Sequence, residues 1–331
     1  MSARAERQPL PQSQLQSQLP QPPLAPLPPV LLLAWRRPDT TARVLAALRR
    51  VQPGRLFIAC DGPRPDVATD AEACRSTRAL IERSIDWPCQ RQWLLRETNR
   101  GCRRGVSEAI SWFFAQVEEG IVLEDDIIAS PQFFSFCAEL LQRYRDDRRV
   151  GVISGCNFQR QRPRDRASYY FSLYNHCWGW ASWRRAWAVY DSELEGWPAF
   201  RDQGWLEDLG GRRFARYWSG CLERVRRGDC DTWDYIWTYS CWRQGLLTCL
   251  PAVNLVRNVG FGHPLAAHTT FGNSPHGPIG ALDAPLRHPL HVLADRRADR
   301  HTFRNQFQPP LARRALARLQ RLLLPAQSRS R

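Results

Sequence analysis

Three consecutive carboxylates, Glu124, Asp125 and Asp126, follow an apolar run at 121–123. At such close range their charges repel one another, and a divalent cation that bridges them to a diphosphate offsets this repulsion. Because carboxylate oxygens are hard ligands, the triplet favours Mg²⁺ or Mn²⁺. The alternative is a solvated acidic turn or helix cap, since a Ser-Pro pair at 130–131 can begin a helix soon afterwards.

Further carboxylates stand in two other segments. Asp61 is part of an Asp-Gly-Pro sequence that is by itself typical of a plain turn. Asp231 and Asp234 lie in an aromatic segment at 231–237. Asp231 can cap a helix that follows it, whereas Asp234 can be a reactive carboxylate or a buried one bonded to indole or backbone groups.

The elements that must position these acids alternate along the chain. Apolar segments at 30–34, 55–60, 90–95, 121–123 and 150–154 are typical of buried strands, and segments at 41–50, 66–83, 105–117 and 131–144 are expected to be helices. Asp39 or Thr40 is the expected N-cap of the first helix. The alternation predicts an α/β fold with a mostly parallel sheet flanked by helices. Ligands gather at the carboxyl ends of such strands, where Asp61 and the triplet both lie.

Four motifs in this order make residues 30–270 similar to bacterial sugar transferases of the GT-A superfamily, near glycosyltransferase family 2. The motifs are Leu-Leu-Ala-Trp-Arg-Arg-Pro at 32–38, Ile-Ala-Cys-Asp-Gly-Pro at 58–63, Asn-Arg-Gly-Cys-Arg-Arg-Gly at 99–105 and Val-Leu-Glu-Asp-Asp-Ile at 122–127. The Glu-Asp-Asp form resembles that of N-acetylglucosaminyltransferase I. The resemblance implies a GT-A-like fold in which the loops of the first strands bind the nucleotide, while the acidic motif binds metal and diphosphate.

The resemblance also implies roles for single residues on the donor side. Asp126 would ligate the metal, with Glu124 and Asp125 contributing to donor binding. Asp61 would accept hydrogen bonds from the base or ribose. The other donor-side candidates are Asn99 and Gly101 for the shape of the nucleotide pocket, and Arg37, Arg103 and Arg104 for phosphate contacts. For the last two arginines the alternative is solvent exposure on the first turn of a helix.

Aromatic residues follow this donor region, and ten of the 14 tryptophans lie between 178 and 242. We expect this half to be irregular and to face the substrate. Small residues between large rings at 176–183 would let the backbone pass close to a sugar. The candidates for an acceptor or sugar pocket are Trp178, Gly179 and Trp233, against the alternative of a tryptophan-rich core, to which Trp183 and Trp187 are assigned.

Two late candidates complete the site that the resemblance implies. The segment 231–237 resembles an acceptor-side region in which one carboxylate is the general base, and Asp234 is the candidate. Related enzymes often return a late histidine to the metal or diphosphate, and His268 fits that role better than His263, which precedes a proline. An exposed loop histidine is the alternative for His268.

Composition limits the partners. The chain has 331 residues, 43% of them hydrophobic, and a formal charge of +15 with no lysine. Because its arginines are interleaved with acids along most of the chain, the charge suits phosphorylated substrates and does not indicate nucleic acid. No two of the 11 cysteines are spaced as Cys-x-x-Cys, so the sequence does not support a zinc site, and reduced thiols are expected.

The expected organisation has four parts. Residues 1–28 form a disordered Pro- and Gln-rich leader, 29–155 bind the nucleotide sugar, 156–275 form the acceptor and catalytic portion of the same domain, and 276–331 form a basic tail. An amphipathic helix at 311–324 would attach to anionic lipid or pack on the domain. The sequence shows neither a membrane-spanning apolar segment nor a signal peptide, so the expected location is cytoplasmic. Attachment to the inner face of the cell membrane is the alternative.

The sequence therefore predicts a metal-dependent, inverting glycosyltransferase that moves a sugar from a nucleotide-diphospho-sugar, first of all a UDP-sugar, to a glycan or lipid-linked hydroxyl in cell-surface polysaccharide or glycolipid synthesis. One alternative is a sugar-phosphate nucleotidyltransferase, which usually has a glycine-rich loop where Arg-Arg-Pro stands at 36–38. Another is a non-catalytic basic protein that binds glycan or nucleic acid. Such a protein would lose the carboxylates, and all three remain.

Overall fold

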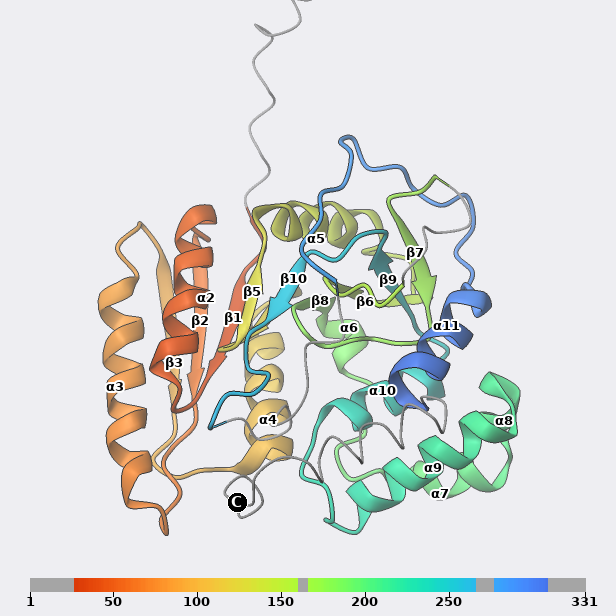
Figure 1. The fold of residues 1–331 in the computed structure, drawn as a ribbon, viewed down its shortest axis with the longest axis horizontal. Helices are drawn as coiled ribbons and strands as arrows, with labels where there is room; N and C mark the ends of the chain where they lie inside the picture. The colour runs from red at the N-terminus through yellow and green to blue at the C-terminus, as the bar shows by residue number, and fades with distance from the viewer. Residues whose placement is uncertain (1–26, 160–165, 266–276, 309–331) are drawn as a thin grey trace, which may run out of the picture.

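A computed structural model describes residues 27–159, 166–265 and 277–308 of the chain, and its central feature is one large sheet (Figure 1). The strands are β1 (Val30–Ala34), β2 (Arg55–Cys60), β3 (Gln90–Leu95), β4 (Glu119–Glu124), β5 (Ile127–Ala129), β6 (Val150–Ser154), β7 (Tyr169–Ser172), β8 (Trp180–Trp183), β9 (Leu247–Pro251) and β10 (Val256–Asn258). Eight of them form the sheet in the order β3-β2-β1-β4-β8-β6-β9-β7, and β10 pairs with β5 separately.

The sheet is mostly parallel, as predicted. Strands β1 to β4 run parallel to one another, and β6 runs parallel to β9. Strand β8 lies antiparallel between β4 and β6, and β7 is antiparallel to β9. The expected strands at 30–34, 55–60, 90–95 and 150–154 are confirmed at both ends.

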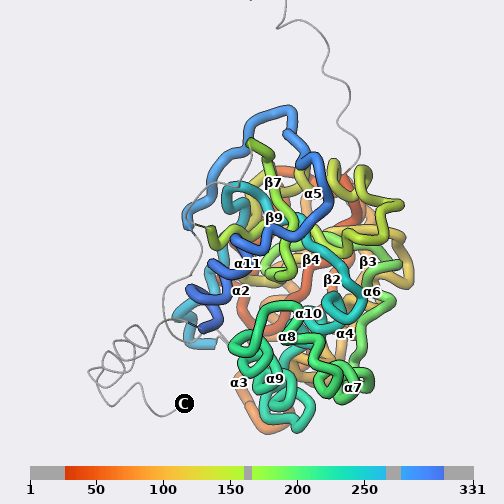
Figure 2. Tube along the Cα trace, turned by 90° about the vertical axis from the view of Figure 1, so that its right-hand side faces the viewer, coloured from red at the N-terminus to blue at the C-terminus, as the bar shows by residue number. Residues whose placement is uncertain are grey.

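Helices cover both faces of this sheet (Figures 1 and 2). They are α2 (Pro38–Val51), α3 (Ala68–Ser84), α4 (Gly101–Gln116), α5 (Pro131–Arg143), α6 (Arg184–Trp187), α7 (Trp197–Asp202), α8 (Trp205–Gly210), α9 (Arg212–Arg226), α10 (Asp234–Arg243) and α11 (Arg296–Thr302), followed by the π-helical turn η1 (Phe303–Phe307). The prediction for the first N-cap was wrong: Arg37 occupies it, because Pro38 suits the first helical position. Helix α4 also begins four residues before the expected Gly105.

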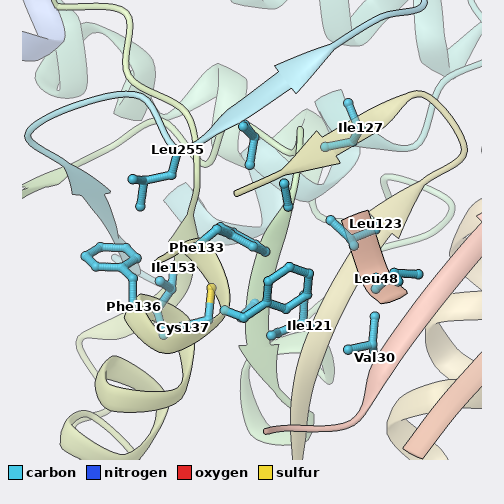
Figure 3. Close-up of a cluster of buried hydrophobic side chains, with 14 of the residues drawn as sticks. Val30, Leu48, Ile121, Leu123, Ile127, Phe133, Phe136, Cys137, Ile153 and Leu255 are labelled. Carbon is cyan, nitrogen blue, oxygen red and sulfur yellow. The ribbon is translucent and has the colours of Figure 1, made fainter. Parts of the chain in front are cut away.

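Alternation along the strands divides the core into two layers. In β1, Val30 and Leu32 pack with residues of α2 and α5, as the cluster in Figure 3 shows, whereas Leu31 and Leu33 pack with α4. Successive side chains of a strand point to opposite faces, and here both faces are buried. The sheet is therefore fixed from both sides, which gives the loops at the ends of its strands a rigid base.

The aromatic half differs from the expectation of an irregular, substrate-facing portion. It contains α6 to α10, and most of its tryptophans are buried in aromatic clusters, while Trp205 is 49% exposed. Trp183 and Trp187 are buried, in agreement with their assignment to the core. The correction has a visible cause: apolar residues of α9 recur at helical spacing, which buries one face of that helix against α10.

Several expected features lie outside the described residues, namely His268, the helix at 311–324 and most of the leader at 1–28. Within the described ranges, no helix is both long and apolar enough to cross a bilayer. All 11 cysteines fall inside those ranges and are free thiols.

A buried carboxylate fixes the C-terminal segment to the sheet. Asp299 of α11 is only 6% exposed, and it accepts hydrogen bonds from the Ser172 hydroxyl at 2.6 Å and from the Leu173 amide at 3.3 Å. Burial raises the pKa of Asp299 to about 6, although these hydrogen bonds oppose the shift. The folded state therefore binds this proton more tightly than the unfolded state does.

The contribution of Asp299 to the free energy of unfolding should consequently fall as pH rises. The stabilising effect of the Asp299 proton is complete below the unfolded pKa and is lost as pH rises through about 6. The amide oxygen of Asp299→Asn can still accept a hydrogen bond. We predict that, from pH 4 to pH 8, the free energy of unfolding of this variant rises relative to that of the wild type by up to about 3 kcal/mol. Urea unfolding at both pH values measures this difference. Asp146→Asn, at an exposed carboxylate, is the control, and parallel pH profiles for Asp299→Asn and wild type would contradict the prediction.

Candidate active site

The ends of several strands meet around one cavity of about 570 Å³. The backbone after β1 contributes Trp35, the end of β2 is followed by Asp61, and β4 ends at Glu124. Helix α10 approaches from the aromatic half with Asp234 at its first position. The residues predicted for the site that line this cavity are Arg37, Asp61, Asn99, Gly101, Glu124, Asp125, Asp126, Trp178, Trp233 and Asp234.

Arg37 is bonded to two acids of the triplet. Its guanidinium donates to Asp126 Oδ2 at 2.9 Å and, through the other terminal nitrogen, to Asp125 Oδ1. The amide of Trp35 donates to the second oxygen of Asp125 at 3.3 Å. The side chains of Arg37, Asp125 and Asp126 are 13%, 5% and 7% exposed, so this is a nearly buried ion pair. Arg37 is the arginine expected to contact phosphate, and its terminal nitrogens donate to these two acids.

Burial governs the electrostatics of this group. Burial, followed by the neighbouring charge of Asp126, raises the pKa of Glu124, and burial likewise raises the pKa of Asp126. Burial lowers the pKa of Arg37, but the charges of Asp125 and Asp126 more than compensate and raise it above its usual value. The arginine therefore stays charged and offsets part of the repulsion among the carboxylates.

A glycine lets the loop after β10 approach this ion pair. A Cβ atom on Gly260 would lie 2.1 Å from Asp126 Oδ2 and 3.1 Å from Arg37 Nη1. The loop is fixed by a hydrogen bond from the Val259 amide to the Asp126 carbonyl at 2.8 Å, and by the pairing of β10 with β5. Any side chain at 260 would have to displace the carboxylate of Asp126.

The acids fit a hard cation in part. Asp126 Oδ1 is buried without a hydrogen-bond partner among the described residues, and the charge of Asp126 contributes to the raised pKa of Glu124. Oxygen donors of this kind suit Mg²⁺ or Mn²⁺. In the described ranges no group of three or more His, Cys, Asp or Glu side chains is placed to hold a metal ion.

Asp61 organises another part of the cavity lining. It accepts hydrogen bonds from the amides of Gly62 and Arg100 at 2.9 Å and 3.0 Å, and from the Asn99 side chain at 2.9 Å. Burial raises the pKa of Asp61 against the effect of these bonds. A ligand group at this carboxylate would therefore meet oxygens that already bind the 99–101 loop.

The acids of the 231–237 segment separate into two positions. The hydroxyl of Thr232 donates to Asp234 Oδ1, so the carboxylate at the start of α10 has a fixed orientation. Asp231 does not cap that helix. It accepts instead from the amides of Cys102 at 2.7 Å and Arg103 at 3.0 Å, at the start of α4.

Three residues predicted for the site, namely Arg103, Arg104 and Gly179, do not line the cavity. Arg103 donates to the Ser192 carbonyl and to Glu193 at 3.2 Å, and Arg104 is exposed. A Cβ on Gly179 would lie 2.9 Å from Val256 Cγ1, so this glycine serves the packing of the core. Trp178 lines the cavity and contacts Phe261 edge-on at a centroid distance of 5.4 Å.

Two further arginines in the lining were not predicted. Arg36 donates to Asp70 at 2.8 Å and Arg64 donates to the same carboxylate at 2.7 Å, and Asp70 is fully buried. Both guanidinium groups lie over the Trp35 ring, at 4.3 Å and 5.2 Å from its centroid. Arg36 lies inside a motif that the sequence analysis quoted, but nothing local indicates that Asp70 would orient it.

Comparisons with known proteins add little. No protein-family profile matches the chain, and no curated protein matches its sequence. Among solved structures, HddC from Yersinia pseudotuberculosis is similar at 11% identity and a TM-score of 0.30, over 48% of this chain and 78% of that one. A UDP-glucose pyrophosphorylase complexed with UDP-glucose is similar at 9% identity and a TM-score of 0.27, over 49% and 79%. Such weak likenesses support no functional argument, so function is argued from the site.

The ion pair predicts a stability defect that a cation relieves. Arg37→Met leaves two nearly buried carboxylates without their guanidinium, and breaking a buried pair in this way typically costs about 3–5 kcal/mol. We expect that loss in urea unfolding with chelator present. Mn²⁺ should then stabilise the variant more than the wild type, because the acids have lost their own cation.

Arg104→Met is the matched control, because this arginine is exposed and makes no contact with the triplet. If Arg37→Met unfolds at the same urea concentration as Arg104→Met, and Mn²⁺ affects both equally, Arg37 is not the counter-ion of the site.

Proposed function

We propose that this protein is a glycosyltransferase that moves a sugar from a nucleotide-diphospho-sugar to the hydroxyl of a glycan or lipid-linked acceptor. One observation carries the proposal: Asp234 reaches the same cavity as Glu124, Asp125 and Asp126, from the other half of the chain. A transfer between two substrates needs such an arrangement, with one carboxylate at the acceptor and a separate acidic group at the departing diphosphate. The motifs that resemble the GT-A superfamily support the same assignment.

On the acceptor side, Asp234 is the proposed general base. It would take the proton of the acceptor hydroxyl as the oxygen attacks the anomeric carbon, which implies inversion at that carbon. The Thr232 hydroxyl orients one oxygen of Asp234. Trp178 and Trp233 line the adjacent wall, where an aromatic ring can contact the apolar face of a sugar.

On the donor side, the proposed nucleotide wall consists of Asp61, Asn99 and Gly101, with the base or ribose near Asp61. Arg36 and Arg64 replace Arg103 and Arg104 as candidates for phosphate contacts, since only the first pair lines the cavity. Asp126, with Glu124, would hold Mn²⁺ or Mg²⁺. When bound, such an ion supplies charge that stabilises the departing diphosphate.

The first experiment identifies the reaction by its products. With Mn²⁺ and a panel of nucleotide sugars, UDP-sugars first, we expect release of nucleoside diphosphate, and Asp126→Ala or excess chelator should abolish this release. Ser130→Ala, at the cap of α5 outside the cavity, is the control for folding. Full release of nucleoside diphosphate in excess chelator would contradict the proposed requirement for a metal ion. Formation of nucleotide sugar and pyrophosphate from a sugar phosphate and a nucleoside triphosphate would instead show a nucleotidyltransferase, and binding without turnover a non-catalytic protein.

The second experiment concerns the base. Asp234→Asn keeps the size of the side chain but removes its ability to accept a proton, so turnover should fall about 10²–10⁴-fold while donor affinity is retained. Steady-state turnover and equilibrium binding of the nucleoside diphosphate measure the two quantities. Asp229→Asn, at an exposed acid near the same segment, should keep wild-type values. Near-normal turnover of Asp234→Asn, with loss of turnover in Asp191→Asn, would show that the wrong carboxylate was chosen.

A further inference from the structure

The first turn of α4 is capped by a carboxylate from a distant part of the chain. Its own N-cap residue, Arg100, provides no side-chain hydrogen bond. Asp231, 128–129 residues further along, accepts from the Cys102 amide with one oxygen and from the Arg103 amide with the other, at 2.7 Å and 3.0 Å. Two of the amides that a helix start leaves unpaired are thus bound by one side chain.

Gly101 permits this contact. A Cβ at that position would lie 2.7 Å from Asp231 Oδ2, and the glycine has a φ of +75°, a conformation that other residues rarely adopt. On the other side of the turn, Asp61 accepts from the Arg100 amide, and a Cβ on Gly105 would lie 3.0 Å from Asp61 Oδ2. The start of α4 therefore lies between two carboxylates, one on the nucleotide wall and one on the segment before α10.

The segment that begins at Asp231 leads directly to the proposed base. Thr232 bonds to Asp234, and Trp233 is 2% exposed and stacks on Trp180 with a centroid distance of 5.8 Å. Three contacts thus hold the segment from Asp231 to Asp234. Asp231 bonds to the start of α4, Thr232 bonds to Asp234, and Trp233 packs in the core. Of these contacts, the one made by Asp231 bonds to the backbone at the start of α4, where the Cys102 thiol also bonds to the Trp233 backbone.

We infer that Asp231 is a positioning residue that ties the segment carrying Asp234 to the nucleotide wall, and so aligns the base with the bound donor. The inference rests on the proposed function for what is aligned, whereas the tie itself is a property of the fold. Asp231 touches no reacting atom in this role. A displacement of about 1 Å at a reacting group can cost about 100-fold in rate, so a cap that only positions the segment carrying the base can control turnover.

The test compares three substitutions. Asp231→Ala removes both acceptors, while Asp231→Asn and Asp231→Ser each keep one oxygen that can cap the helix. We expect Asp231→Ala to lose about 100-fold in kcat, with the affinity for nucleoside diphosphate changed less than kcat. Asp231→Asn and Asp231→Ser should recover most of the rate. The acidic limb of the pH–rate profile, which the base sets, should stay in place in all three.

Hydrogen exchange provides a readout that does not depend on activity. In Asp231→Ala, amides of 100–106 and of 231–237 should both exchange faster than in the wild type, and Asp231→Asn should restore both. Slower or unchanged exchange at 231–237 would overturn the tie. If Asp231→Asn is as inactive as Asp231→Ala and lacks the acidic limb, Asp231 is itself the base and the inference is wrong.

The two proposals can fail separately. If Asp231→Ala turns over at the wild-type rate while the wild type transfers sugar, positioning by Asp231 is refuted and the proposed function stands. If the wild type transfers no sugar but exchange changes in both segments as expected, the proposed function is refuted and the tie stands. Should Asp231→Ala not fold, Asp231→Thr supports the same comparison with a smaller expected loss, because threonine caps a helix less well than aspartate, asparagine or serine.

Discussion

The ion pair of Arg37 with Asp125 and Asp126 determines what the rest of this site can do. Two unit charges of the same sign about 4 Å apart repel by about 4 kcal/mol at the effective dielectric of a protein surface. Several carboxylates in one cavity therefore need a cation or protons. The structure supplies a guanidinium from the turn before α2 and raises the pKa of Glu124 and Asp126. Any ligand with a cation of its own must share these acids with Arg37.

The parallel sheet holds these acids close together in spite of their repulsion. Because β1, β2 and β4 run in the same direction, the residues that follow them emerge at one edge of the sheet. Both faces of these strands are buried, so the strand ends cannot move apart to relieve the repulsion without disturbing two core layers. The loop at Gly260 also lies directly against Asp126 and Arg37. The fold thus holds together acids that would otherwise separate.

Local patterns predicted the parts of this arrangement that depend on neighbouring residues. Strand ends at 30–34 and 55–60, and the positions of Asp61 and the acidic triplet after strands, follow from apolar runs and turn residues. Patterns failed where the partner is remote. Arg103 pairs with Glu193, and Arg36 is oriented by Asp70, at separations that no local rule detects. The expectation that the aromatic half is irregular and faces the substrate differs from the structure for a related reason, since aromatic enrichment alone does not distinguish a core from a binding surface.

The same remote contacts restrict where an anionic ligand can bind. A helix of the length of α4 ordinarily offers its first amides, and the positive end of its dipole, to a phosphate. Here Asp61 and Asp231 already accept from the amides of Arg100, Cys102 and Arg103, so protein carboxylates take that place. A diphosphate in the cavity must find positive charge elsewhere. Arg36 and Arg64 line the cavity, and an ion at Asp126 would add to them. Under the proposed function, the diphosphate would therefore bind to Arg36, Arg64 and an ion at Asp126 rather than to the start of α4.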